Sequence, residues 1–198
     1  MEELTSFLIA SCLLTLSPGP DLLMVIAKSL EQGRTAALYF IAGLITGLCG
    51  HTFLLVVGWA QFIGERPDIV MGIKVLGCIY FCYLGARAIY FYFYVDPTTV
   101  VEKRSGSNAY KQGVLMNLLN PKVTLFFWLF FPGFLFTTQW STAEQYVILG
   151  AIFLAQAVVI FSFVAFFSAQ FHHLFSRFRF GIISGVLWIL LGIYLVLP

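Results

Sequence analysis

The sequence predicts an all-α integral membrane protein with six transmembrane helices, arranged as an inverted 3+3 repeat with broken helices 1 and 4. Composition supports the first part: 60% of the 198 residues are hydrophobic and 10% are charged, whereas soluble domains carry about 25% charged residues. Proline insertions in two apolar segments support the second part, because proline interrupts a helix. The lipid bilayer is therefore the expected surrounding. A net charge of +2 without a Lys/Arg-rich run excludes nucleic acid as an expected partner.

Six apolar segments are long enough to cross a bilayer, which takes about 20 residues. They cover residues 4–30, 36–60, 68–94, 110–136, 144–170 and 180–197. The longest polar stretch, 96–109, separates a first three-helix repeat (1–95) from a second (110–198), within what we expect to be one domain overall. A repeat of three spans reverses its orientation when it crosses the second time. The two repeats are therefore expected to be related by an axis in the membrane plane.

Basic residues flank every second connection between the segments. Those near the first, third and fifth connections are Lys28, Arg34, Arg87, Lys103, Arg104, Lys111, Arg177 and Arg179. The fourth connection carries only Glu144, and the amino terminus begins with Glu2 and Glu3. Because cytoplasmic loops are enriched in Lys and Arg, these three connections, including the 96–109 linker, are expected in the cytoplasm. Both termini are expected on the outside.

Two proline insertions interrupt apolar segments. Ser17-Pro18-Gly19-Pro20-Asp21 interrupts the first segment, and Asn120-Pro121-Lys122 interrupts the fourth. Pro18, Pro20 and Pro121 are the predicted helix-break residues, since each removes a backbone donor and clashes with the preceding turn. Asn120 fits an N-cap, and Pro121 fits the first position of the helix that restarts. One break carries an acid and the other a base, a combination typical of a transporter's central binding site.

The two charged residues at the breaks are the first candidates for substrate binding. A carboxylate within the membrane is costly enough to indicate function, so Asp21 is expected to hold a substrate ammonium group or a proton. The alternative is that Asp21 only complements the dipole of the helix it begins. Lys122 lies in a first helical turn, where a cation is unfavourable. It therefore needs Asp21 or a ligand carboxylate nearby, unless its side chain extends to the headgroups.

Four further residues are predicted to contribute to substrate binding. His51 is a candidate for a substrate or proton contact, or alternatively a core histidine bonded to a neighbouring helix. Asn117 and Asn120 are candidates for orienting the substrate. The alternative for Asn117, as for Gln156, is a hydrogen bond that links two helices, since amides within spans often form such bonds. Gly19 is expected to let the backbone open. The sequence predicts no catalytic residue, no metal site, no cofactor and no enzyme.

Two long motifs resemble a known family. Leu16 to Leu30, LSPGPDLLMVIAKSL, resembles the opening motif of the LysE/RhtB family of amino-acid exporters, and Gly113 to Phe127, GVLMNLLNPKVTLFF, resembles its second-half motif. The resemblance covers nearly the whole chain and is nearest the homoserine/threonine-type efflux branch. It implies a bacterial inner-membrane exporter of amino acids or their derivatives, with its termini in the periplasm. It also implies an antiporter with protons as the coupling ion, and a homodimer.

Two alternatives compete with export. A transmembrane thiol–disulfide carrier needs reactive cysteines that meet across the two halves, but Cys12, Cys49, Cys78 and Cys82 all belong to the first half. We expect these four to be small buried apolar residues. A non-transporting scaffold subunit is the other alternative, and it leaves the charges within the membrane unexplained.

Overall fold

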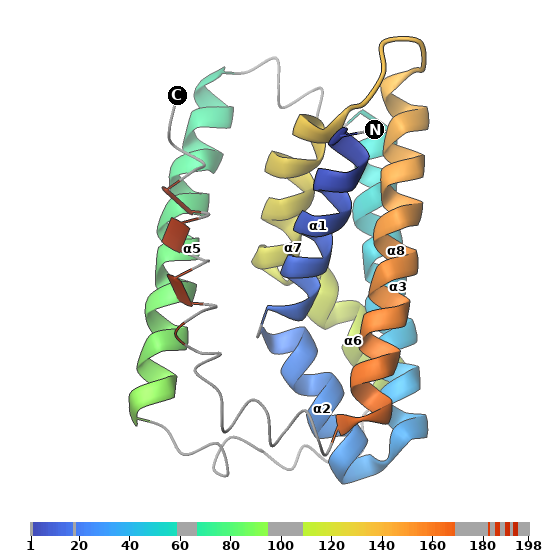
Figure 1. The fold of residues 1–198 in the computed structure, drawn as a ribbon, viewed down its shortest axis with the longest axis vertical. Helices are drawn as coiled ribbons and strands as arrows, with labels where there is room; N and C mark the ends of the chain where they lie inside the picture. Colours follow the sequence, from blue (N-terminus) through green and yellow to red (C-terminus); the bar gives the residue numbers. More distant parts are fainter. Residues whose placement is uncertain are drawn as a thin grey trace. The chain divides into compact units, whose positions relative to one another are not determined.

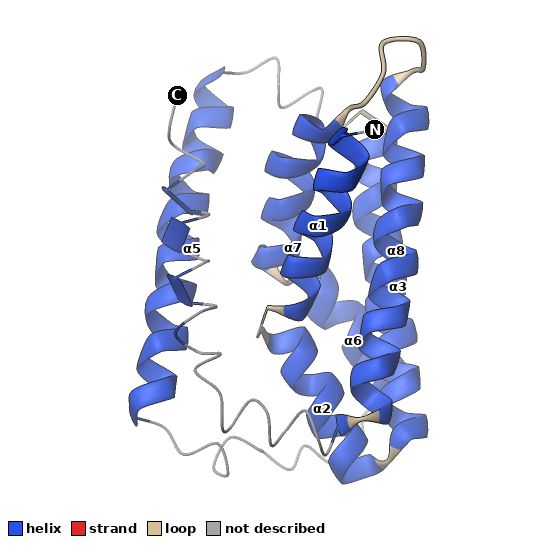
Figure 2. Cartoon of the chain, in the orientation of Figure 1, coloured by secondary structure: helices blue, strands red, loops and turns tan. Residues whose placement is uncertain are grey.

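The computed structural model describes residues 2–17, 19–58, 67–94 and 109–168, together with single positions between 182 and 193. These residues form helices joined by turns, with no strand among them (Figure 2). The all-α class is therefore confirmed for the described chain. The chain divides into two compact units: unit 1 combines Met1–Phe62 with Ser107–Ser168, and unit 2 combines Ile63–Gly106 with Ala169–Pro198.

The first apolar segment is two helices, α1 (Glu2–Leu16) and α2 (Pro20–Gln32), which meet at an angle of 54° (Figure 1). Gly19 is the N-cap of α2 and Pro20 stands in its first turn, where its missing N–H costs nothing. The break thus falls within the proline insertion that predicts it. Pro18 itself lies outside the described residues.

The fourth segment is also broken where its proline predicts. α6 (Ala109–Leu118) ends before Asn120, and α7 (Pro121–Leu125) continues through a π-helical turn, η2 (Phe126–Phe130), and a 3-10 turn, η3 (Phe131–Phe134). The two parts meet at 46°. Asn120 is the N-cap as predicted, since its side-chain Oδ1 accepts the backbone N–H of Lys122 at 3.1 Å.

Two helices of unit 1 are unbroken, α3 (Arg34–Val56) and α8 (Thr142–Phe166). α8 begins at a capping box, in which the Ser141 N–H donates to Glu144 Oε2 at 2.8 Å and the Glu144 N–H donates to Ser141 Oγ at 3.3 Å. Both helices are long and apolar enough to cross a membrane. Each bent pair adds one more span when counted as a unit, which makes up to four spans in the described part of the chain. This is a multi-pass membrane protein.

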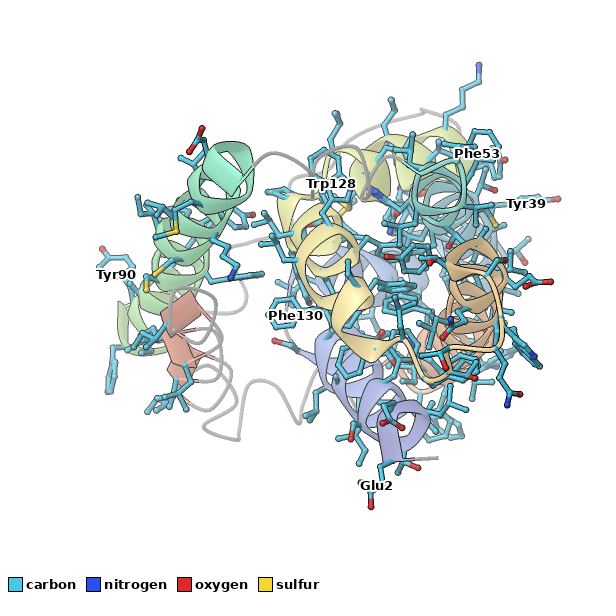
Figure 3. The ribbon with its side chains drawn as sticks, turned by 90° about the horizontal axis from the view of Figure 1, so that it is seen from above. Glu2, Tyr39, Phe53, Tyr90, Trp128 and Phe130 are labelled. Atoms are coloured by element: carbon cyan, nitrogen blue, oxygen red, sulfur yellow. The ribbon has the colours of Figure 1, made fainter. Side chains whose placement is uncertain are left out.

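The helices of unit 1 approach closely at glycines. Gly43 of α3 faces Gly113 of α6, and a Cβ atom on Gly43 would lie 2.9 Å from the Gly113 Cα atom. Such small residues let helix backbones meet in a membrane, where dispersion contacts drive association. Another part of the α3 surface carries large apolar side chains: Figure 3 shows Tyr39 and Phe53 projecting outward, and both are more than half exposed. These side chains are suited to lipid.

A cluster of phenylalanines forms the aromatic core of unit 1. Phe7 of α1 packs edge-on against Phe131 at 5.0 Å between ring centroids, Phe127 stacks on Phe131 at 4.2 Å, and Phe153 of α8 lies 5.3 Å from Phe127. Phe126 also packs against Phe153, and these five residues together are named the phenylalanine cluster. The aromatic run of the fourth segment therefore packs inside the protein at these positions.

Unit 2 contains α5 (Pro67–Tyr94), which corresponds to the third predicted span. Its Gly85 faces Gly185 of the last segment, and Gly192 faces the backbone of Cys78. Since the residue numbers rise along one segment as they fall along the other, the two segments are antiparallel. Most of the sixth predicted span, 180–197, lies outside the described residues.

Candidate functional site

The two helix breaks of unit 1 meet each other. Asn120, the N-cap of α7, donates from Nδ2 to Asp21 Oδ2 at 2.9 Å. Lys122 donates from Nζ to the backbone carbonyl of Ser17 at 3.0 Å. α1 ends at Leu16, and carbonyls at a helix end need a donor from elsewhere. The lysine of one break therefore satisfies a carbonyl exposed by the other.

Asp21 and Lys122 are both buried, with 6% and 5% of their surfaces exposed. Their opposite charges attract each other across the two breaks, and this attraction offsets part of the cost of removing charges from water. The other carboxylate oxygen of Asp21, Oδ1, is buried without a hydrogen-bond partner. One oxygen of the carboxylate is therefore held by Asn120, while the second remains an acceptor.

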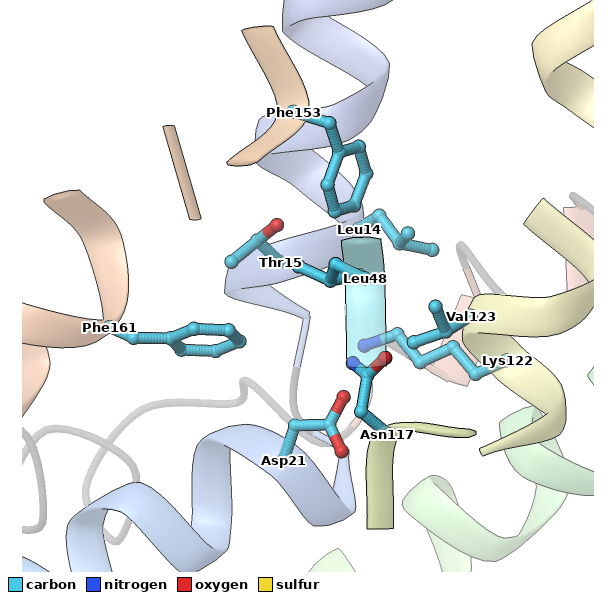
Figure 4. A pocket seen from close by; sticks show the side chains of 9 residues that line it. All are labelled: Leu14, Thr15, Asp21, Leu48, Asn117, Lys122, Val123, Phe153 and Phe161. Atoms are coloured by element: carbon cyan, nitrogen blue, oxygen red, sulfur yellow. The ribbon is translucent and has the colours of Figure 1, made fainter. Parts of the chain in front are cut away.

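A small cavity lies between these residues (Figure 4). It is lined by Leu14, Thr15, Asp21, Leu48, Asn117, Lys122, Val123, Phe153 and Phe161, which come from both broken helices and from α3 and α8. The space open to water-sized molecules is about 20 Å³, which suffices for one or two waters. Sites that enclose organic ligands measure about 300–1,000 Å³. A larger ligand therefore fits only after the walls move.

The polar groups at one side of the cavity are complementary to a zwitterion. Lys122 supplies a cation. Asp21 Oδ1 and Asn117 Oδ1 are buried acceptors without a partner, and only 1% of the Asn117 surface is exposed. Buried acceptors of this kind are stabilised when a donor reaches them. A molecule with an ammonium and a carboxylate group can satisfy all three residues at once.

Two of the predicted binding residues, Asn120 and Gly19, do not line the cavity but contact residues that do. Asn120 holds Asp21 by its hydrogen bond to Oδ2. Gly19 has an extended backbone, with φ −152° and ψ 176°, which other residues also adopt. A Cβ atom at Gly19 would instead lie 3.1 Å from Lys122 Nζ. The glycine thus provides space for the lysine, and no unusual backbone angle is needed.

His51 is buried in α3 and does not line the cavity. Its Nε2 lies 3.4 Å from the backbone carbonyl of Asn117, and its ring packs 5.4 Å from that of Phe127. Nδ1 is buried without a partner. His51 therefore stands behind Asn117 and contacts a neighbouring helix. These are the contacts of a core histidine bonded to another helix, the alternative role that the sequence leaves open for His51.

The cavity also has a polar residue that the sequence does not single out. Thr15 lines it, and Gln156 of α8, which the sequence offers as a possible link between helices, donates from Nε2 to Thr15 Oγ1 at 3.0 Å. Ser11 and Thr15 stand one turn apart in an apolar helix, which is a weak signal for a polar face of α1. The apolar wall residues, such as Leu48 and Phe161, carry no sequence signal that separates them from other core residues.

Contacts between helices close unit 1 on both sides of the cavity. The phenylalanine cluster includes Phe7, which is eight residues, about 12 Å, from Thr15 along α1. In the other direction, Ser29 is eight residues from Asp21 along α2, and its Oγ donates to the Ala165 carbonyl at 2.6 Å. Ser168 Oγ in turn donates to Ser29 Oγ at 3.2 Å. The cavity thus lies between an aromatic and a polar closure.

The four cysteines are free thiols. Cys49 is exposed, which corrects the prediction that it is buried, and the other three are half-buried. An exposed position on an apolar helix is tolerated because lipid is as apolar as a protein core. Among the described residues, no group of three or more His, Cys, Asp or Glu side chains is placed to hold a metal ion.

Comparison with known proteins adds to this geometry. A family model described as LysE type translocator matches residues 12–198. The chain is 31% identical over 155 residues to a homoserine/homoserine lactone efflux protein of Salmonella typhimurium, covering 78% of this chain and 75% of that protein. It is 28% identical over 145 residues to the leucine efflux protein of Salmonella typhimurium, covering 73% and 68%. It is 29% identical over 175 residues to an uncharacterized membrane protein of Bacillus subtilis, covering 84% and 83%. No solved structure matches the chain significantly.

Proposed function

Because the chain belongs to the LysE type translocator family, we propose that it exports small amino acids or amino-acid derivatives across the bacterial inner membrane. Members of this family are transporters and not enzymes. The names of the homoserine and leucine efflux relatives support this class of substrate. The observation that carries the proposal is the pair of opposite buried charges at the two helix breaks, which converge on one cavity.

The substrate is bound as a zwitterion. Lys122 attracts the carboxylate, aided by the positive amino-terminal end of the helix that begins at Pro121. The ammonium group donates to Asp21 Oδ1 and Asn117 Oδ1, the two acceptors that lack a partner. Asn120 orients Asp21 through its 2.9 Å hydrogen bond. Support for this mode comes from the match between three unsatisfied or charged groups and the two ends of an amino acid.

Transport requires the two closures to open in turn. The cavity is too small for an amino acid, so binding must separate either the phenylalanine cluster or the contacts of Ser29. The breaks before Pro20 and Pro121 are suited to this motion, because a half-helix can tilt there without breaking hydrogen bonds within its neighbour. The aromatic closure faces the periplasm and the Ser29 closure faces the cytoplasm in the orientation that the basic residues predict.

We propose the inverted 3+3 repeat as the architecture, with repeats over 1–95 and 110–198 and the linker 96–109 in the cytoplasm. Two observations support it. Each compact unit takes corresponding parts of both halves. In unit 2, the contacts are reciprocal: Gly85 faces Gly185, and Gly192 faces Cys78, the neighbour of Gly77. Gly77 and Gly85 lie in the third segment, and Gly185 and Gly192 lie with similar spacing in the sixth, the third span of the second repeat. An axis that relates Gly77 to Gly185 and Gly85 to Gly192 exchanges these two contacts.

Protons are the proposed coupling ion, exchanged for substrate as in an antiporter. Asp21 is the proposed proton carrier, since a buried carboxylate that binds the ammonium group can take up a proton when the substrate leaves. Efflux should then fall when an uncoupler collapses the proton gradient. The homodimer rests on the family resemblance, and cross-linking in native membranes tests it.

The experiment that tests export compares charge-removing variants. Cells or proteoliposomes are loaded with a panel of labelled amino acids, and initial efflux is measured for the wild type, Asp21→Asn and Lys122→Gln at matched membrane levels. Loss of a charge-assisted hydrogen bond, about 1.5–3 kcal/mol, slows efflux by about 10–150-fold. The exposed residues Asp68 and Lys111 provide the matched controls, Asp68→Asn and Lys111→Gln. Normal efflux in both buried-charge variants would sink the proposed site.

The thiol–disulfide carrier makes an opposite prediction. A variant with all four cysteines replaced by alanine should export at the wild-type rate if the charge pair carries the function, and should be inactive if thiol exchange does. A scaffold subunit predicts that no amino acid of the panel moves in reconstituted vesicles. Each outcome identifies one class.

A further inference from the structure

The break in the fourth segment leaves one backbone carbonyl without the donor it would have in a continuous helix. In an α-helix, each carbonyl accepts the N–H of the residue four positions later. Four positions after Asn117 stands Pro121, which has no N–H. The Asn117 carbonyl instead accepts the N–H of Asn120 at 3.0 Å. Because a carbonyl oxygen has two lone pairs, it still has room for a second donor.

His51 of α3 supplies this second donor from another helix. Its Nε2 lies 3.4 Å from the Asn117 carbonyl oxygen. Since a carbonyl only accepts, Nε2 carries the proton in this hydrogen bond, and Nδ1 is the unprotonated nitrogen. Lys122 acts in a similar way at the first break, where its Nζ donates to the Ser17 carbonyl at 3.0 Å. At each break, a side chain from a different helix thus donates to an exposed carbonyl.

His51 contacts the fourth segment on both sides of its break. Before the break it bonds the Asn117 carbonyl. After the break its ring packs against that of Phe127, with 5.4 Å between the centroids and 36° between the planes. The histidine is buried, with 3% of its surface exposed, and it belongs to a helix that is unbroken. It therefore provides a rigid support for the 46° angle between the two parts of the segment.

Gly47 adds a second contact between α3 and Asn117. It lies one turn before His51, so both residues are on the same face of the helix. A Cβ atom on Gly47 would lie 2.6 Å from Asn117 Oδ1. The side chain of Asn117 thus packs against the glycine while its carbonyl bonds the histidine. These two contacts fix both the position and the rotation of Asn117, whose amide lines the cavity together with Lys122 (Figure 4).

We propose that His51 is a positioning residue for substrate binding, which sets the angle of the break in the fourth segment by its hydrogen bond to the Asn117 carbonyl. Through that angle it holds Asn117, before the break, and Lys122, after it, at the cavity. His51 itself does not line the cavity, so it acts on the substrate only through these two residues. The proposal rests on the proposed function, because the positions matter only if the cavity binds the amino acid.

The test separates binding from the amount of active protein. Initial efflux is measured from proteoliposomes containing the full chain, over a range of internal concentrations of the panel amino acid that the wild type exports fastest. His51→Phe keeps an aromatic ring against Phe127 but removes the donor. Its KM should rise about twofold to tenfold, the worth of one uncharged hydrogen bond, and its maximal rate per folded protein should change less. A variant that only folds poorly lowers the maximal rate and leaves KM unchanged.

Two amide variants test whether the donor itself matters. The amide nitrogen of glutamine is as many bonds from the backbone as histidine Nε2, whereas that of asparagine corresponds to Nδ1. His51→Gln should therefore keep KM near the wild-type value, and His51→Asn should raise it as His51→Phe does. Thr52→Val is the control for packing of α3, because the Thr52 hydroxyl donates within its own helix, to the Leu48 carbonyl at 3.0 Å. It should keep the wild-type KM.

The outcomes are distinguishable. A wild-type KM in both His51→Phe and His51→Asn overturns the positioning role, and so does an equal rise in the glutamine and asparagine variants, which would assign the effect to the ring. A rise of the same size in Thr52→Val also overturns it, since general packing then explains the result. If His51→Phe does not insert, the comparison of the two amide variants decides. Wild-type vesicles that export no amino acid of the panel overturn the proposed function together with this inference.

Discussion

Replacing Gly47 by alanine should disable the site by moving Asn117. A Cβ atom on Gly47 would lie 2.6 Å from Oδ1, 2.7 Å from Cβ and 2.9 Å from Cγ of Asn117. Ordinary contact begins at 3.4 Å, so the Asn117 Cβ atom must move by about 0.7 Å, the difference between 3.4 and 2.7 Å. A Cβ atom moves only with its backbone, and α6 must shift with it. The amide at the cavity is then displaced.

The expected effect is larger on transport than on stability. Overpacking costs about 1–3 kcal/mol, and the better helix propensity of alanine returns about 1 kcal/mol. A displacement of about 1 Å, by contrast, lowers the rate of a process that needs precise positioning about 100-fold. For Gly47→Ala we therefore expect a protein that inserts and folds, with efflux lowered on the order of tenfold to a hundredfold.

The assay is initial efflux of a labelled amino acid from preloaded vesicles, normalised to the amount of folded protein by gel filtration in detergent. Gly50→Ala is the control on the same helix. A Cβ atom there would meet only Leu118 Cδ2, at 3.2 Å, and the end of a leucine side chain can move. Efflux for the control should stay within about twofold of the wild type. Wild-type efflux by Gly47→Ala, at a normal folded yield, would refute the placement of Asn117 in the binding site.

Three further predictions concern stability. Lys122→Gln should lower the free energy of unfolding by about 3–5 kcal/mol, because it leaves Asp21 buried without its charge partner. The double variant Asp21→Asn/Lys122→Gln should lose less stability in thermal unfolding than the two single variants lose together, and additive losses would contradict the pairing. Gly85→Ala should lower the melting temperature, because its Cβ atom would lie 2.5 Å from a backbone carbonyl of the facing segment, whereas Gly72→Ala, with nothing within 4 Å, should not; equal melting temperatures would contradict the crossing. Gln145→Ala should speed proteolysis of the loop before α8, which its side chain holds by hydrogen bonds to the backbone; an unchanged cleavage rate would show that the loop is held by other contacts.

Both helix breaks were predictable from the sequence because their cause is local. The prolines remove a backbone donor at Pro20 and Pro121 wherever the chain lies, and Asn120 caps the helix two residues away from the N–H it accepts. The all-α membrane class was likewise predictable, since the length and apolarity of segments such as α8 decide whether a span is favourable.

The meeting of the two breaks was a prediction that used the opposite charges they carry. Asp21 and Lys122 are each costly in a membrane when alone, so they were expected to share one location. The structure brings both to one cavity. At Gly19, whose backbone is extended, the small size of glycine matters because Lys122 lies against it.

The other walls of the cavity were not predictable from the chain order. Thr15 and Gln156 are 141 residues apart and meet only because α1 packs on α8. His51 resembles a binding residue in sequence, yet packing places it behind Asn117. Such positions depend on helix rotation and on close approaches between distant glycines, which no local pattern specifies.

The sequence by itself therefore determined the membrane class, the positions of the two breaks and the charges they carry, because proline chemistry and transfer from water to lipid act on each segment alone. Only the tertiary structure decided which polar groups face the cavity and which stand behind it. Those choices follow from the close packing of helices that are far apart in sequence, such as the approach of Gly47 of α3 to Asn117 of α6.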